Sequence, residues 1–130
     1  ALIVPGGFGA AKNLSDFAIN GEDIRVNEQV LAVCQAFAKA NKPAGYMCIA
    51  PVMIPLIYGE GAQATIGQDI AIAQSLTNIG LAHRACAVDD IVVDEARKLV
   101  STPAYMLATS LVEAASGINK LVEKVIKMAN

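Results

Sequence analysis

Apolar residues along the chain form two kinds of pattern, short continuous runs and longer stretches with helical spacing. The first run, Ala1 to Val4, stops at the turn residues Pro5-Gly6-Gly7 and is typical of a short buried strand. The second run, Ala44 to Cys48, begins directly after the helix breaker Pro43 and has the same interpretation. Further strands are predicted over residues 62–66, 85–93 and 98–101.

Between these runs, apolar residues recur along one helix face. From about residue 26 to residue 40 they lie at Val30, Val33, Cys34, Phe37 and Ala38, which is the i, i+3, i+4, i+7 pattern. A short helix is predicted from Ile49 onward, with Pro51 in its first turn and Pro55 late enough to kink or end it. Helices are also predicted over residues 69–78, 105–115 and 118–128, with Gly117 interrupting the last two, and residues 10–18 are predicted to form a short helix or a turn.

Strands that alternate with helices indicate an α/β fold in which a mostly parallel sheet is covered on both faces. A length of 130 residues corresponds to one domain. Because the sequence opens inside an apolar strand, we expect upstream sequence to be missing.

Composition narrows the class of protein. Hydrophobic residues make up 55% of the chain, charged residues 17%, and the net charge is −2 with no basic run, so we expect no nucleic-acid partner. The uncharged run after Lys42, ending at Gly59, is shorter than the roughly 20 apolar residues of a membrane span and contains two prolines. We therefore expect no membrane partner either.

Cysteine and histidine usage argues against a metal site. Three widely spaced cysteines and one histidine, without a Cys-x-x-Cys pair, do not supply the ligands of a structural zinc site. The odd number of cysteines fits a reducing compartment. We expect neither a metal nor a cofactor.

Cys48 is the leading candidate for chemistry. The order strand, cysteine, helix places a side chain at a sharp turn above the sheet, where a helix N-terminus favours the thiolate. The alternative is a plain core cysteine, since free cysteine is among the most buried residue types. Cys34 lies on the apolar face of a predicted helix and is assigned to the core, whereas the pattern around Cys86 decides neither way.

The glycine-rich stretch from Pro5 to Lys12 has two functional interpretations. A dinucleotide fingerprint would need a third glycine where Lys12 stands and an acidic residue after the next strand, and the sequence has neither. The alternative is that Gly6 and Gly7 point bare backbone N–H groups toward Cys48 as an oxyanion hole or anion nest. An ordinary tight turn remains open as well.

His83 is the only histidine, so any cysteine–histidine pair must use it. It follows a predicted helix stop at Ile79-Gly80 and lies in a predicted loop, where a surface role is the alternative. The acidic residues of the same region are interpreted as solvated turn charges: Asp89, Asp90, Asp94 and Glu95.

Three segments together, "PGGFGAAKNLSDFA", "GYMCIAP" and "VDDIVVD…STPAYM", resemble the ElbB family, also called the ES-one family, of the DJ-one/PfpI superfamily. The resemblance implies a flavodoxin-like three-layer sandwich of the class I glutamine amidotransferase type and a homodimer. It also implies Cys48 at a nucleophile elbow, with an oxyanion hole made by Gly7 and the backbone N–H groups near the cysteine, including that of Ile49. It further implies that residues 1–130 are the C-terminal portion of a single α/β domain, with βα units upstream that would supply the superfamily's glutamate partner for the cysteine.

The sequence departs from the wider superfamily at three places. Ile49 stands where protease-like relatives have histidine, and Ser101 to Met106 lack the His-x-Glu of glutamine amidotransferases. Tyr46 stands where a nucleophile elbow prefers a small residue, a preference that Ala50 does satisfy. These departures disfavour peptidase and glutaminase activity.

The resemblance implies a cysteine-dependent glyoxalase-type enzyme that converts small glyoxal-like dicarbonyls to hydroxy acids without glutathione. Cys48 would be the nucleophile and His83 a secondary candidate. The alternative is a non-catalytic redox sensor or interaction protein of the same fold that uses Cys48. We expect a cytoplasmic protein, with a mitochondrial address as the alternative.

Overall fold

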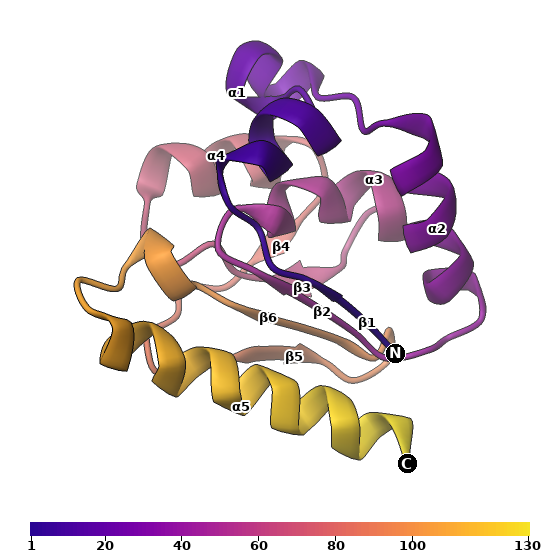
Figure 1. Ribbon diagram of the computed structural model, residues 1–130. Coiled ribbons are helices and arrows are strands. Elements are labelled where there is room, and N and C mark those ends of the chain that lie inside the picture. The colour runs from indigo at the N-terminus through magenta and orange to yellow at the C-terminus, as the bar shows by residue number, and fades with distance from the viewer.

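The computed structural model describes residues 1–130 (Figure 1). A four-stranded sheet with the order β1-β2-β6-β5 forms its centre, and a two-stranded sheet of β3 and β4 lies beside it. The strands are β1 (Leu2–Val4), β2 (Ala44–Met47), β3 (Gln63–Ala64), β4 (Ala82–His83), β5 (Val92–Asp94) and β6 (Leu99–Thr102). The helices are α1 (Phe17–Asn20), α2 (Glu28–Lys39), α3 (Ile54–Tyr58), α4 (Ile70–Asn78) and α5 (Leu111–Ala129).

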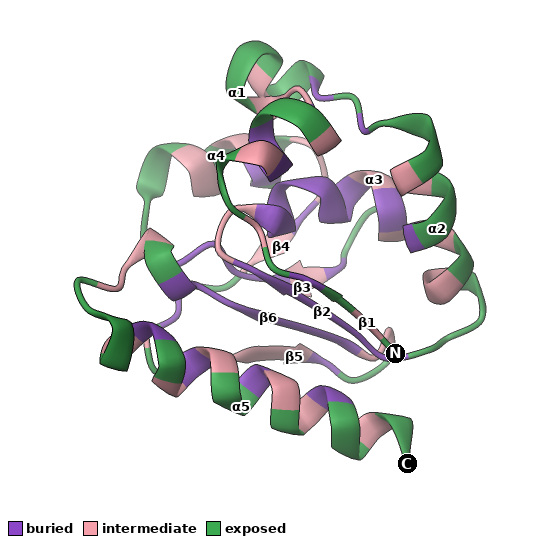
Figure 2. Cartoon of the chain, in the orientation of Figure 1, coloured by how far each residue is buried: buried purple, intermediate pink, exposed green.

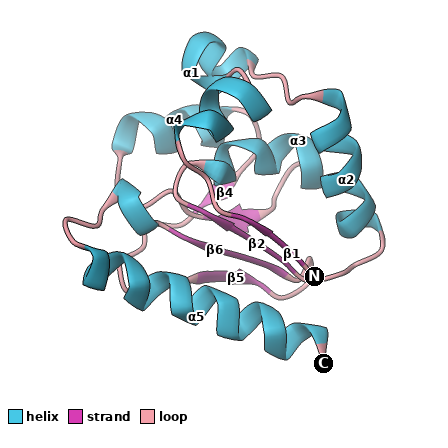
Figure 3. Ribbon diagram, viewed as in Figure 1, coloured by secondary structure: helices cyan, strands magenta, loops and turns pink.

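The central sheet is mostly parallel, as predicted. Strand β2 pairs in parallel with β1 and with β6, and only β5 runs antiparallel to its neighbour β6. Figure 3 shows α5 along one face of this sheet and the other helices on the opposite side. The predicted α/β class with both faces covered is therefore confirmed.

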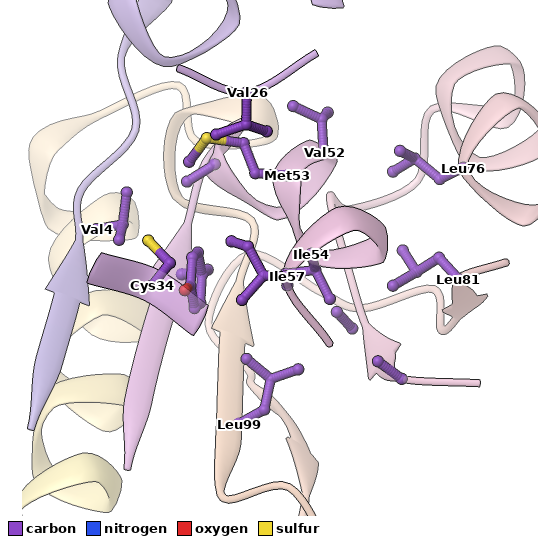
Figure 4. Packing of buried hydrophobic residues seen from close by; sticks show 14 of the residues in the cluster. Val4, Val26, Cys34, Val52, Met53, Ile54, Ile57, Leu76, Leu81 and Leu99 are labelled. Atoms are coloured by element: carbon purple, nitrogen blue, oxygen red, sulfur yellow. The ribbon is translucent and has the colours of Figure 1, made fainter. Parts of the chain in front are cut away.

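Two apolar clusters fill the space between these layers. The larger cluster lies between the sheet and the helices opposite α5, and includes Val4, Cys34, Ile54 and Leu99 (Figure 4). The smaller cluster joins the sheet to Leu121 and Val125 of α5. Strands β2 and β6 lie between the two clusters and are buried along their whole length (Figure 2), which explains the continuous apolar run of β2. The buried hydroxyls of β6 are hydrogen-bonded, since Ser101 accepts from the Thr65 amide and Thr102 donates to the Asp90 carbonyl.

Several predicted elements form close to their predicted bounds. The Asn27 side chain caps α2 by accepting from the amides of Gln29 and Val30, and Asp69 caps α4 by accepting from Ile72. After Cys48 the chain forms a 3-10 turn, Ala50–Met53, before α3. Pro55 lies in the first turn of α3, where its missing N–H removes no intrahelical bond.

The predicted strand over residues 85–93 was mostly wrong. Only its last two residues belong to β5, and the chain instead places a strand, β4, at Ala82–His83, where a loop was predicted. Strand β4 has two residues and pairs only with β3, so it leaves no periodic signal in the sequence.

The predicted break at Gly117 was also wrong, because α5 continues through this residue without interruption. An added Cβ at Gly117 would collide with the Val88 carbonyl oxygen and would lie 2.7 Å from Thr102 Oγ1. The glycine therefore permits close packing of α5 and does not end it. The predicted helix over residues 105–115 is instead a 3-10 turn, Ala104–Met106, followed by α5, which starts after its cap Ser110.

Asp94 was predicted to be a solvated turn residue, and the structure corrects this. Its side chain is only 2% exposed, accepts from the Gln63 amide at 2.9 Å, and pairs with Arg97 at 3.1 Å. The bond from the Gln63 amide connects β5 to the start of β3. Asp89, Asp90 and Glu95 are exposed, as predicted.

Candidate functional site

The carboxyl ends of β1, β2 and β6 meet at one edge of the sheet. Gly6 and Gly7 follow β1, Cys48 follows β2, and Pro103 follows β6. The Cys48 amide donates to the Thr102 carbonyl at 3.1 Å, which extends the pairing of β2 with β6 by one residue. The register of the sheet therefore fixes the position of Cys48 beyond the strand ends, where open α/β sheets bind their ligands.

Cys48 has an unusual backbone conformation, with φ +61°. Non-glycine residues rarely occupy this left-handed region, and such strain concentrates at functional sites. The strand, the left-handed cysteine and the following 3-10 turn together make the sharp strand-to-helix turn of a nucleophile elbow. The predicted placement of Cys48 on a turn after a buried strand matches the structure.

Gly6 makes room for this turn. It has φ +89°, and an added Cβ would lie 2.6 Å from the Met47 carbonyl oxygen and 2.9 Å from the Cys48 Cβ. Tyr46, the bulky residue at the elbow, is fully buried and packs edge to face on Tyr58 with ring centroids 6.2 Å apart. The close approach at the elbow is thus made possible by a glycine from the neighbouring loop.

Three backbone N–H groups around Cys48 have no acceptor within the chain. They belong to Gly6, Gly7 and Ile49, whereas the Cys48 amide is used by the bond to Thr102. A Cβ built on Gly6 would also lie 3.5 Å from the Ile49 nitrogen, so the two loops are in direct contact. Free N–H groups beside a nucleophile are the donors that an oxyanion requires.

A pocket of about 450 Å³ opens at Cys48. Cys48, Ile49 and Gly7 form one part of its wall, and none of its lining residues is charged. The remaining lining residues are Phe8, Ala11, Phe17, Ala18, Tyr105 and Met106. The pocket therefore combines one thiol and free amides with a wall that is otherwise apolar.

The structure does not bring His83 to this pocket. Its Nε2 accepts from the Ile66 amide at 3.2 Å, and it lies in β4, outside the central sheet. Partial burial lowers the pKa of His83, so the ring is neutral near pH 7.

The other two cysteines are buried. Cys34 is 3% exposed within the larger apolar cluster, as predicted. Cys86, which the sequence left undecided, is 6% exposed and donates to the Ala87 carbonyl. Burial, with the carboxylates of Asp90 and Asp89 next, raises the pKa of the Cys86 thiol to about 11. It is therefore protonated at neutral pH and a poor nucleophile.

Sequence reasoning missed the apolar walls of the pocket. Phe8 and Tyr105 lie inside the motifs already quoted, next to Gly7 and Pro103, so their positions carried a signal. Phe17 also lies inside the first motif, but its approach to the pocket depends on the direction of the short helix α1 and of the preceding π-helical turn, Ala10–Leu14, which the sequence does not specify.

Two further properties of the chain concern metal binding and membrane crossing. No cluster of three or more His, Cys, Asp or Glu side chains is arranged to hold a metal ion. None of the helices has both the length and the apolar character that crossing a bilayer requires.

Comparison with known proteins places the chain among relatives of similar fold. It is 39% identical over 98% of its length to the rat "ES1 protein homolog, mitochondrial" and to the human "Glutamine amidotransferase-like class 1 domain-containing protein 3, mitochondrial". In each case it covers 51% of the relative, so the chain spans about half the length of the curated relatives it matches. No protein-family model matches the chain.

A solved structure supports the same relationship. The crystal structure of an isoprenoid biosynthesis protein with an amidotransferase-like domain from Ehrlichia chaffeensis superposes with a TM-score of 0.82 at 26% identity. The match covers 97% of this chain and 58% of the other. The predicted flavodoxin-like, class I glutamine amidotransferase type of fold is thus confirmed.

Proposed function

Because this chain belongs to the ElbB-type family of ES1 and glutamine amidotransferase-like class 1 domain proteins, we propose that it acts as a cysteine-dependent glyoxalase-type enzyme. The substrates would be glyoxal-like dicarbonyls, converted to hydroxy acids without glutathione. The observation that carries this proposal is the left-handed Cys48 beside the three free N–H groups of Gly6, Gly7 and Ile49.

In the first step the Cys48 thiolate attacks the aldehyde carbon of the dicarbonyl. A carbon–sulfur bond forms, and the electron pair of the carbonyl double bond moves to its oxygen. The free N–H groups of Gly6, Gly7 and Ile49 donate to this oxygen as its negative charge develops. Protonation of the oxygen gives a hemithioacetal.

The second step is an internal redistribution of hydrogen. A base removes the proton from the former aldehyde carbon, and a proton is returned to the neighbouring carbonyl carbon, so that one carbon is oxidised and the other reduced. The product is a thioester of Cys48, which water hydrolyses to the 2-hydroxy acid and the free thiol. The net reaction consumes one water and needs no external oxidant or reductant.

The base of this step is not among the residues that line the Cys48 pocket. None of the residues lining the Cys48 pocket carries a carboxylate or an imidazole, and the curated relatives are about twice as long as the part they share with this chain. We propose the superfamily's glutamate for this role, as the sequence resemblance implied.

Glutamine hydrolysis and peptidase activity are less well supported. Both would need a histidine near Cys48, and His83 is engaged by the Ile66 amide outside the pocket. Tyr105 and Met106, which follow β6, contribute apolar wall in its place.

The test compares two cysteine variants of the full-length protein in the conversion of methylglyoxal to lactate. We expect Cys48→Ala to lower kcat by more than about a thousandfold, as loss of a nucleophile does in other enzymes. Cys34→Ala, which removes a buried core thiol, should keep the activity. Equal activity of the two variants would reject Cys48 as the nucleophile.

The alternative is a redox sensor that uses Cys48 without turnover. It is favoured by the lack of an acid or base in the pocket. Hydrogen peroxide titration with mass spectrometry separates the two functions, because selective oxidation of Cys48 in a protein without dicarbonyl turnover would support the sensor.

We further propose a homodimer. For its location, the names of the rat and human relatives carry the word mitochondrial, and this favours the mitochondrial address over the cytoplasmic one.

A further inference from the structure

We infer that the Cys48 pocket selects carbonyl compounds with an apolar, above all aromatic, substituent over glyoxal and methylglyoxal. The inference rests on the proposed function for its chemistry, and it adds a substrate class to it. The supporting observation is that the pocket has a few polar groups near Cys48, while most of its lining side chains are apolar.

The polar groups of the pocket lie on one side. Cys48, Ile49 and Gly7 all line it, and they supply the thiol and two of the free N–H groups. These groups can engage a single carbonyl. Among the other lining side chains, only the Tyr105 hydroxyl and the weakly accepting Met106 thioether can form a hydrogen bond.

The apolar side is built from two aromatic rings that remain exposed. Phe8 is 71% exposed and Tyr105 is 55% exposed, although both line the same pocket as Cys48. Large exposed apolar side chains that gather around a concave site mark a binding surface. An aromatic ring seated there would cover Phe8 and Tyr105 and gain the offset or edge-to-face contacts that aromatic pairs prefer.

The size of the pocket supports the same class. A volume of about 450 Å³ lies within the range of roughly 300–1,000 Å³ that is usual for sites of small organic ligands. Glyoxal, with four heavy atoms, would leave most of this space to water. A phenyl-substituted dicarbonyl would displace that water from apolar walls.

The lack of charged residues in the pocket lining disfavours anionic substituents on the substrate. None of the lining residues is charged, and Lys12, whose ammonium lies 5.9 Å from the centroid of the Phe8 ring, is not among them. A phosphate or carboxylate on the substrate would lose hydration without gaining an ion pair inside the pocket. The structure therefore favours a neutral apolar substituent.

Turnover provides the first test. We expect kcat/KM for phenylglyoxal to exceed that for methylglyoxal by at least about tenfold, since even one methylene in an apolar pocket changes specificity by about that factor. Phe8→Ala should bring the ratio of the two values close to one. The control Ile126→Ala, which changes an exposed apolar residue of α5 outside the pocket, should leave the ratio unchanged.

A second measurement does not depend on turnover. Phenylacetaldehyde and acetaldehyde are compared as protectors of Cys48 against alkylation by iodoacetamide, each normalised to its hemithioacetal with 2-mercaptoethanol. We expect phenylacetaldehyde to protect at about a tenfold lower concentration, and Phe8→Ala to remove this advantage.

The outcomes separate the two claims. Turnover of methylglyoxal with a phenylglyoxal ratio near one would overturn the substrate class and leave the proposed function standing. No turnover together with selective protection by phenylacetaldehyde would overturn the proposed function and support the apolar selectivity. Equal protection by the two aldehydes would overturn the inference.

Discussion

His83 must stay neutral to keep its hydrogen bond, because Nε2 accepts from the Ile66 amide at 3.2 Å. Partial burial lowers its pKa from the ordinary value of 6.5, so the unfolded chain binds a proton more readily than the folded one. The stability that this residue contributes is therefore fully present above about pH 6.5 and is lost as the pH falls through the folded pKa.

We predict that the free energy of unfolding, measured by urea titration, declines between about pH 6.5 and 5.5, within the range where histidine titrates. In His83→Gln, whose amide oxygen can still accept, this decline should be much smaller. An identical decline in both proteins would show that other groups cause it.

The position of Cys48, the one cysteine that is not buried, was predictable, but its surroundings were only partly so. The order strand, cysteine, helix follows from the apolar run and the prolines beside it. The sequence also showed Tyr46 as an obstacle to the elbow. Tyr46 fits because its ring is buried against Tyr58, and the space beside Cys48 is left by Gly6, which lies 42 positions before Cys48 in the chain. No local pattern could reveal either contact.

Helix α5 shows how one residue can mislead the prediction of an element. Glycine lowers helix propensity by about 1 kcal/mol relative to alanine, so Gly117 read as a break. In the structure it is the contact point of α5 with Val88 and Thr102, where a side chain does not fit. A glycine that ends a helix and a glycine that permits close packing cannot be distinguished in the sequence.

We predict that Gly117→Ala lowers the free energy of unfolding by about 1–3 kcal/mol, the usual cost of overpacking, despite the better helix propensity of alanine. Asn119→Ala is the matched control, since Asn119 is exposed on the same helix. It should raise stability slightly. Thermal and urea unfolding measure both, and a stabilised Gly117→Ala would contradict the packing role.

Helices α2 and α4 were predicted close to their bounds because several local signals agree in each of them. Helices α2 and α4 repeat their apolar spacing over several turns and carry side-chain caps at Asn27 and Asp69. Strand β4 has two residues and is held by β3, with Gln63 paired to Ala82 farther along the chain, so its local residues specify little.

Within residues 1–130, strand β1 lies at one edge of the central sheet. Strand β1 pairs only with β2, and beside it lies a groove of about 400 Å³ lined by apolar residues such as Leu2 and Val30. Ile3 and Val33 also line this groove and are 36% and 51% exposed. An apolar sheet edge of this kind favours pairing with a second copy of the chain.

We predict that Ile3→Lys weakens self-association by about tenfold or more, because a lysine on an edge strand opposes pairing. Sedimentation over a range of protein concentrations measures the dissociation constant. Ile126→Lys, at a similarly exposed apolar position on α5, is the control and should leave it unchanged. If both variants associate like the parent, the dimer does not use this edge.

The free amides of Gly6, Gly7 and Ile49 have a consequence for how such a site evolves. The donors beside Cys48 belong to the main chain, so they survive any exchange of side chains that preserves the two turns. The walls contributed by Phe8, Phe17 and Tyr105 are ordinary side chains and can drift freely. Mutation can therefore change what the pocket admits while the thiol and its donors stay in place, so descendants of one such protein would diverge in ligand sooner than in reaction.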